Sequence, residues 1–95
     1  MTITQEMRDV AADELGHEVE DAQINNACNF HYRDKSEWLN SILEEKTNLL
    51  HENGGRGVEL ADEIDNIRIV LALRRGNLIG RLSTASYPRL VLRKP

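Results

Sequence analysis

The 95-residue chain has one cysteine, two prolines and no long apolar run. A single cysteine excludes an intrachain disulfide and is typical of proteins from a reducing compartment. No apolar stretch approaches the roughly 18 residues that a membrane span needs. The first residues also lack the basic start and apolar run of a secretory signal. We therefore expect a cytoplasmic protein that does not enter a membrane.

Aromatic residues are scarce as well, at 4% of the chain, so leucine, isoleucine, valine and alanine must form the core. Hydrophobic residues make up 40% and charged residues 29%, which is typical of a globular protein and not of a disordered one. A chain of this length forms one domain and buries roughly 60–65% of its unfolded surface. Because such a core is modest, we expect a homo-oligomer in which copies cover each other's apolar faces.

Charge is divided unevenly along the sequence, although the net charge is only −4. Before Ile67 there are 16 acidic and five basic residues, whereas from Ile67 onward there are seven basic residues and no acidic one. Such asymmetry suits either an arm for nucleic acid or an acidic partner, or a basic end that folds back on the acidic body, within one copy or between copies. The candidate partner-binding residues are Arg74, Arg75, Arg81, Arg89, Arg93 and Lys94.

Two helices are predicted in the first third of the chain. Apolar residues at three- and four-residue steps indicate a helix over the first fifteen residues. Thr2 and Gln5 have the spacing of a capping box at its start, and Gly16 suits its end. Residues 20–32 also share a helical face, but three asparagines weaken it because their amides compete for backbone hydrogen bonds. A short second helix is expected there.

The clearest pattern predicts two longer helices, residues 35–52 and 57–75, joined by a short glycine-rich turn as an antiparallel hairpin. Asp34 and Glu37 have capping-box spacing at the start of the first. The apolar stripe of the first helix comprises Trp38, Leu39, Ile42, Leu43, Leu49 and Leu50. The predicted buried face of the second comprises Val58, Leu60, Ala61, Ile64, Ile67, Val70 and Leu71.

The end of the chain fits more than one structure. Residues 78–82 suit a helical turn or a strand, and Leu90-Val91-Leu92 after Pro88 suits a strand or an extended arm that binds a neighbouring molecule. The fold class expected is all-α: a small helical bundle built on the hairpin, with an irregular or strand-like basic C-terminal tail. The domain would cover residues 1–87 and the tail residues 88–95.

Carboxylates gather on the predicted hairpin. One side of its second helix carries residues at helical spacing: Glu59, Asp62, Glu63 and Asn66. The neighbouring helix carries Glu44, Glu45 and Asn48. Oxygen ligands from two facing helices are what Mg²⁺ requires, and the alternative is a solvated face of an amphipathic hairpin.

The strings Glu44-Glu45-x-x-Asn48 and Glu59-Leu60-Ala61-Asp62 resemble the metal-binding core of the MazG-type nucleoside triphosphate pyrophosphohydrolases, over residues 38–73. The resemblance implies an oligomeric, all-helical enzyme in which Mg²⁺ activates water to split a nucleotide into monophosphate and pyrophosphate. By this resemblance the metal ligands are Glu44, Glu45, Glu59 and Asp62. The family's third glutamate is Asn48 in this chain, which is a neutral and weaker ligand.

A second candidate metal set comprises His17, Cys28, His31 and His51. Cys28 and His31 are one helical turn apart and would share Zn²⁺ with the other two histidines. The spacing of the four residues is irregular. A lone cysteine on an apolar helical face is more often a buried small hydrophobe, and the sequence favours that interpretation for Cys28.

No complete catalytic set emerges from the sequence, so the leading hypothesis is a non-catalytic protein–protein interaction module. It would act as a regulator, an inhibitor or an assembly factor, a type common in phages and mobile elements, and would need no cofactor. One alternative is the MazG-like, Mg²⁺-dependent hydrolase. Another is a weak nucleic-acid binder that uses the basic C-terminal region.

Overall fold

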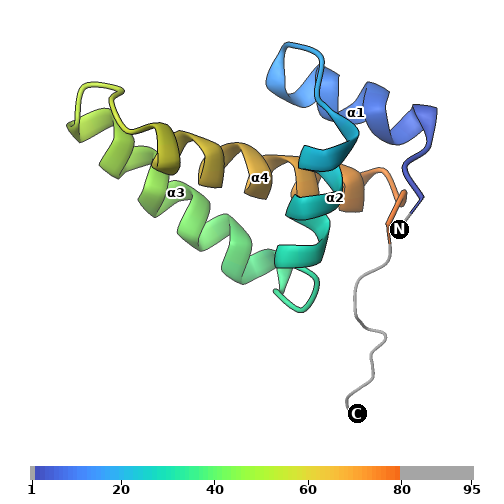
Figure 1. Ribbon diagram of the computed structural model, residues 1–95. Coiled ribbons are helices and arrows are strands. Elements are labelled where there is room, and N and C mark those ends of the chain that lie inside the picture. Colours follow the sequence, from blue (N-terminus) through green and yellow to red (C-terminus); the bar gives the residue numbers. More distant parts are fainter. Residues whose placement is uncertain (1, 80–95) are drawn as a thin grey trace.

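The computed structural model describes residues 2–79, which form four helices and no strand (Figure 1). The helices are α1 (Gln5–Leu15), α2 (Asp21–Phe30), α3 (Ser36–Glu52) and α4 (Val58–Arg75). The predicted all-α class is confirmed for this part of the chain, whereas the tail and the predicted boundary at residue 87 lie outside it. No described helix combines the length with the apolar character that crossing a bilayer requires.

Helix α4 is the centre of the molecule, because α1, α2 and α3 all pack against it (Figure 1). Its C-terminal half is buried on every side rather than along one stripe. The residues of that half that are buried are Ile67, Ile69, Val70, Leu71, Ala72 and Leu73. Since successive residues point in different directions around a helix, burial of this kind requires neighbours all round.

The antiparallel pair of α3 and α4 confirms the predicted hairpin, and both helices begin one residue later than expected. Helices α1 and α2 cover only the end of α4 that is remote from the turn at residues 53–57 (Figure 1). The half of the hairpin next to that turn therefore projects from the body. In the hairpin Ile64 is buried and Leu43 is half-buried, so the two helices do press their apolar sides together.

Three residues assigned to apolar stripes are exposed instead. Trp38 and Leu49 of α3 are 51% and 48% exposed, and Val58 at the start of α4 is 79% exposed. The prediction that they lie in the core is wrong, because nothing in residues 2–79 packs over the outer side of α3 or beyond the first turn of α4. Only Leu39 of the α3 stripe is fully buried.

Both predicted capping boxes are corrected by the structure. Thr4, not Thr2, begins α1: its Oγ1 accepts from the Met7 amide at 3.2 Å, and the Met7 sulfur accepts from the Thr4 amide at 3.5 Å. Helix α3 begins after Lys35 without a side-chain cap. The carboxylate expected to cap it, Asp34, instead accepts a hydrogen bond from the His31 ring at 2.9 Å.

Ion pairs between charged side chains link α1 to α4. Glu14 of α1 accepts from Arg68 Nε at 3.1 Å and from Arg75 Nη2 at 3.0 Å, and both arginines belong to α4. Arg68 also donates to the Glu14 carbonyl at 2.7 Å. Because these groups are partly exposed, each ion pair is worth about 1 kcal/mol or less. Their main effect is to fix the orientation of α1 on α4.

Candidate protein-binding surface

Three of the four aromatic residues lie within nine positions of each other, at the corner between α2 and α3. Phe30 ends α2, Tyr32 lies in the following turn, and Trp38 is in the first turn of α3; we call them the aromatic corner. Their exposed fractions are 81%, 59% and 51%. A domain whose core has so few rings thus presents most of them to its surroundings. The fourth, Tyr87, lies outside the described residues.

The backbone beneath the aromatic corner is firmly held. His31 is 5% exposed, and its ring nitrogen Nδ1 lies 2.9 Å from Oδ2 of Asp34. Arg74 of α4 donates to the His31 carbonyl at 3.2 Å and to Ser36 Oγ at 3.1 Å. Phe30 meets the His31 ring edge-on, with 4.9 Å between ring centres. The corner is therefore preorganised, which lowers the entropy lost when a partner binds.

Charged side chains of both signs lie next to the aromatic corner: Arg33, Lys35 and Glu37 are exposed, and Asp34 is half-buried. No ion pair within residues 2–79 involves Arg33 or Lys35. The nearby carboxylate of Asp34 is already bonded to His31. Aromatic rings flanked by cationic groups suit a partner surface that is apolar with acidic residues at its edge.

Two of the predicted partner-binding arginines have internal hydrogen-bond partners. Arg74 holds the α2–α3 corner through His31 and Ser36, and Arg75 is paired with Glu14. Whether either also meets a partner stays a prediction. The other four, Arg81, Arg89, Arg93 and Lys94, lie outside the described residues.

The carboxylates suggested as Mg²⁺ ligands are exposed on the projecting half of the hairpin: Glu44, Glu45, Glu59 and Asp62. Among residues 2–79, no three His, Cys, Asp or Glu side chains lie together at positions that suit a metal ion. Hence these four are not brought into one site. Between the helices Lys46 Nζ instead lies 2.8 Å from Glu63 Oε1, so one carboxylate on that side is paired with a lysine.

The histidines and the cysteine are also dispersed. Cys28 is 5% exposed in the core, which confirms that it is a buried small hydrophobe. Burial raises the pKa of the Cys28 thiol, and the charge of Arg74 offsets this only in part. His17 Nδ1 lies 2.9 Å from the Glu18 carbonyl, and His51 is exposed in the last turn of α3. The described residues therefore form no zinc site from this set.

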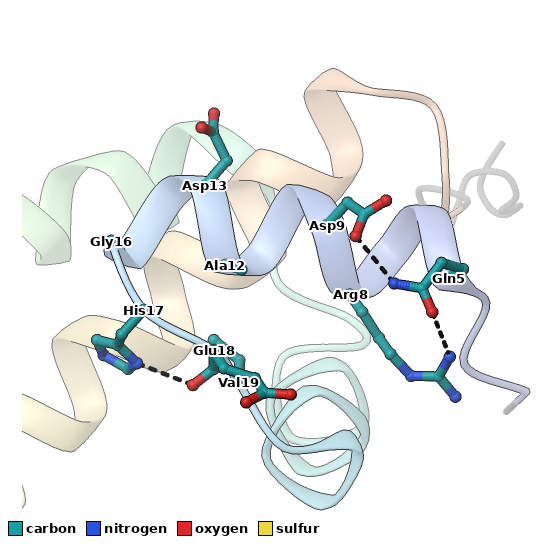
Figure 2. A pocket seen from close by; sticks show the side chains of 9 residues that line it. All are labelled: Gln5, Arg8, Asp9, Ala12, Asp13, Gly16, His17, Glu18 and Val19. Atoms are coloured by element: carbon teal, nitrogen blue, oxygen red, sulfur yellow. Dashed lines mark hydrogen bonds between the residues drawn. The ribbon is translucent and has the colours of Figure 1, made fainter.

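An open hollow of about 630 Å³ lies along α1 and the link to α2 (Figure 2). Its polar groups largely bond to each other: Arg8 donates to Gln5 at 3.1 Å, and Gln5 donates to Asp9 at 2.9 Å. In Figure 2 the Asp13 side chain points away from that of His17. The ring of His17, which also lines the hollow, hydrogen-bonds to the Glu18 backbone carbonyl.

Arg8 also links α1 to α2 through Asp21. Its Nε and Nη2 atoms lie 2.7 and 2.9 Å from the two carboxylate oxygens. The hydrogen bond from Arg8 lowers the pKa of Asp21, and the same bond raises the pKa of Arg8. This bidentate pair engages Arg8, which is the only arginine that lines the hollow.

No family model, curated protein or solved structure matches this chain. The aromatic corner was missed by the sequence pattern, which placed Trp38 in the apolar stripe of α3. The signal that was present is the clustering of three aromatic residues between positions 30 and 38 in a chain that has only four.

Proposed function

We propose that the protein is a non-catalytic protein–protein interaction module whose aromatic corner binds the partner. The observation that carries the proposal is the exposure of Phe30, Tyr32 and Trp38 on a firmly held turn. Tryptophan and tyrosine are enriched among the residues that dominate binding energy in protein interfaces. Acting as a regulator, an inhibitor or an assembly factor would require no further chemistry from the chain.

The energetic gain from covering this corner is substantial. Full burial of an apolar side chain of this size is worth about 1.5–3 kcal/mol. Between half and four-fifths of each side chain is exposed in Phe30, Tyr32 and Trp38. A partner that covered them would therefore gain a large part of this burial free energy. Arg33 and Lys35 would steer an acidic partner surface toward the rings. The partner chemistry we infer is therefore an apolar pocket with an acidic rim.

The test is affinity capture with the purified full chain against extract from the source cells. The corner variant carries Phe30→Ser and Trp38→Gln, and the matched control is Val58→Ser. Val58 is as exposed as Phe30, at 79% against 81%, but lies beside the hairpin turn at the other end of α3. All three substitutions are at exposed positions, so the thermal unfolding midpoint should change little.

We expect one protein to be captured by the wild-type chain and the control, and at least about tenfold less of it by the corner variant, as loss of a hot spot implies. Equal capture by all three chains would contradict the proposal. So would Mg²⁺-dependent release of pyrophosphate from nucleotides that is abolished by Glu59→Gln, because that result would favour the hydrolase.

A further inference from the structure

A second hollow lies between the two helices of the hairpin, on the half that projects from the body. Its volume is about 430 Å³, and we call it the hairpin groove. Its lining residues come from one side of α3 and one side of α4: Leu43, Thr47, Leu50, Ala61, Ile64, Asp65 and Arg68. The lining is mostly apolar, and the groove is separate from the aromatic corner.

The body-side end of the hairpin groove is closed by Arg68. Its guanidinium is fixed by Glu14, through the carboxylate at 3.1 Å and the backbone carbonyl at 2.7 Å. This pairing directs the arginine toward α1, and the same carboxylate also pairs with Arg75. The other charged residue in the lining is Asp65, so the lining itself carries one charge of each sign.

Two further carboxylates flank the hairpin groove by their helical positions. Glu44 lies three residues before Thr47 on α3, and Asp62 lies three residues before Asp65 on α4. Within residues 2–79 no ion pair involves Glu44, Asp62 or Asp65. An apolar groove with carboxylates on both sides suits an apolar segment that carries basic residues at its ends.

We propose that the hairpin groove is occupied by residues 89–94 of the same chain. That segment reads Arg-Leu-Val-Leu-Arg-Lys, an apolar triplet with one cation before it and two after it. In an extended segment Leu90 and Leu92 point to the same side, about 7 Å apart, and enter the groove together. The flanking cations then meet the carboxylates of Glu44, Asp62 and Asp65.

The connecting chain is long enough to reach the hairpin groove. Leu78 and Ile79 pack against the core just after α4, which fixes the starting point. The groove residues of α4 lie 7–14 positions before Arg75, which is about 10–21 Å along the helix axis. The 11 residues from Ile79 to Leu90 span at most about 40 Å. The chain therefore has ample length to return along α4.

Attachment to the same chain favours this occupant over a second copy. A short tether gives the segment an effective concentration in the millimolar range, which exceeds the concentration of free protein in most experiments. The contact is partly electrostatic between exposed groups, so salt should weaken it. The proposal does not depend on the aromatic corner, because the two surfaces share no residue.

Disulfide trapping in the full-length chain tests the proposal. The test chain carries Thr47→Cys and Leu90→Cys, and the matched control carries Glu45→Cys and Leu90→Cys. Thr47 lines the hairpin groove, whereas Glu45 is also exposed but is two residues from both Leu43 and Thr47 and thus faces away. Under mild oxidation the products are followed by non-reducing electrophoresis and peptide mass mapping. Native Cys28 is buried and its products are identified by the same mapping.

We expect the intramolecular disulfide between positions 47 and 90 to form at least about tenfold faster than the control disulfide, as a high effective concentration implies. About 0.5 M NaCl should reduce this advantage. Replacing Arg89, Arg93 and Lys94 by glutamate in the test chain should remove it. Equal rates for positions 45 and 47, or a disulfide-linked dimer as the main product, would overturn the proposal.

Discussion

The ring of His31 and the carboxylate of Asp34 form a hydrogen bond, 2.9 Å long, within the connection between α2 and α3. His31 is 5% exposed, and the ring needs an acceptor because a buried polar group without one is costly. The acceptor is supplied by Asp34. Asp34 therefore stabilises the turn that carries the aromatic corner, and does not cap α3.

Removal of the Asp34 carboxylate should destabilise the protein. Asp34→Ala leaves the His31 Nδ1–H buried without its acceptor, and we expect the free energy of unfolding to fall by about 1–3 kcal/mol. Asp13→Ala is the matched control, since Asp13 is exposed and takes part in no ion pair within residues 2–79. Urea unfolding measures both. An equal loss in the two variants would show that the bond to His31 contributes nothing specific.

The central position of α4 leads to a second expected outcome. Ile69 is fully buried, whereas Val58 at the start of the same helix is 79% exposed. Ile69→Ala should lower the free energy of unfolding by about 2–5 kcal/mol through lost burial and the cavity left behind. Val58→Ala should change it by about 0.5 kcal/mol or less. Similar losses from both substitutions in urea unfolding would contradict the central placement of α4.

The hairpin was predictable from the sequence because its helices have strong periodicity and a turn with three glycines between them. Periodicity shows which side chains share a face, but not whether another element covers that face. Trp38 and Val58 illustrate the difference, since both fit a stripe and both are exposed. The cap at Thr4 was missed for a related reason: a methionine sulfur replaces the expected Gln or Glu acceptor.

The candidate sites were harder to predict from the sequence than the hairpin, because they depend on tertiary contacts. Arg74 carries the charge expected of a partner-binding residue, but its bonds to His31 and Ser36 fix the aromatic corner from α4. His31 and Ser36 are 43 and 38 positions from Arg74, which is a separation that no local pattern reveals. The exposed rings could have been noted from composition, whereas their firm support could not.

The pair of Arg8 and Asp21 should make stability depend on acidity. The hydrogen bond from Arg8 lowers the pKa of Asp21 below its ordinary value of 3.8. Since the depressed pKa belongs to the folded state, the contribution is fully present above the unfolded pKa. It is lost as the pH falls through the folded value. Arg8→Gln should therefore reduce stability near neutral pH and weaken the fall in stability on acidification below about 4.

Thermal unfolding of the wild-type chain and Arg8→Gln across the acidic range measures this effect. Asp13→Asn is a suitable control, because Asp13 is an exposed carboxylate of the same helix and takes part in no ion pair within residues 2–79. The effect should be small, as both members of the Arg8–Asp21 pair are largely solvated. If the pH profiles of the wild-type chain and Arg8→Gln have the same shape, the pair does not link α1 to α2 in solution.

Magnesium offers the sharpest distinction between the interaction module and the hydrolase. A ligand that binds only the folded state raises the unfolding temperature, and the stabilisation grows with the logarithm of one plus the ratio of ligand concentration to Kd. Glu44, Glu45, Glu59 and Asp62 are exposed, and the described residues do not gather them around one point. We therefore expect millimolar Mg²⁺ to leave the unfolding temperature of the wild-type chain and of Glu59→Gln equally unchanged. A rise in the wild-type chain that Glu59→Gln abolishes would instead establish a metal site on the hairpin, which is the first requirement of the hydrolase that the MazG-like strings imply.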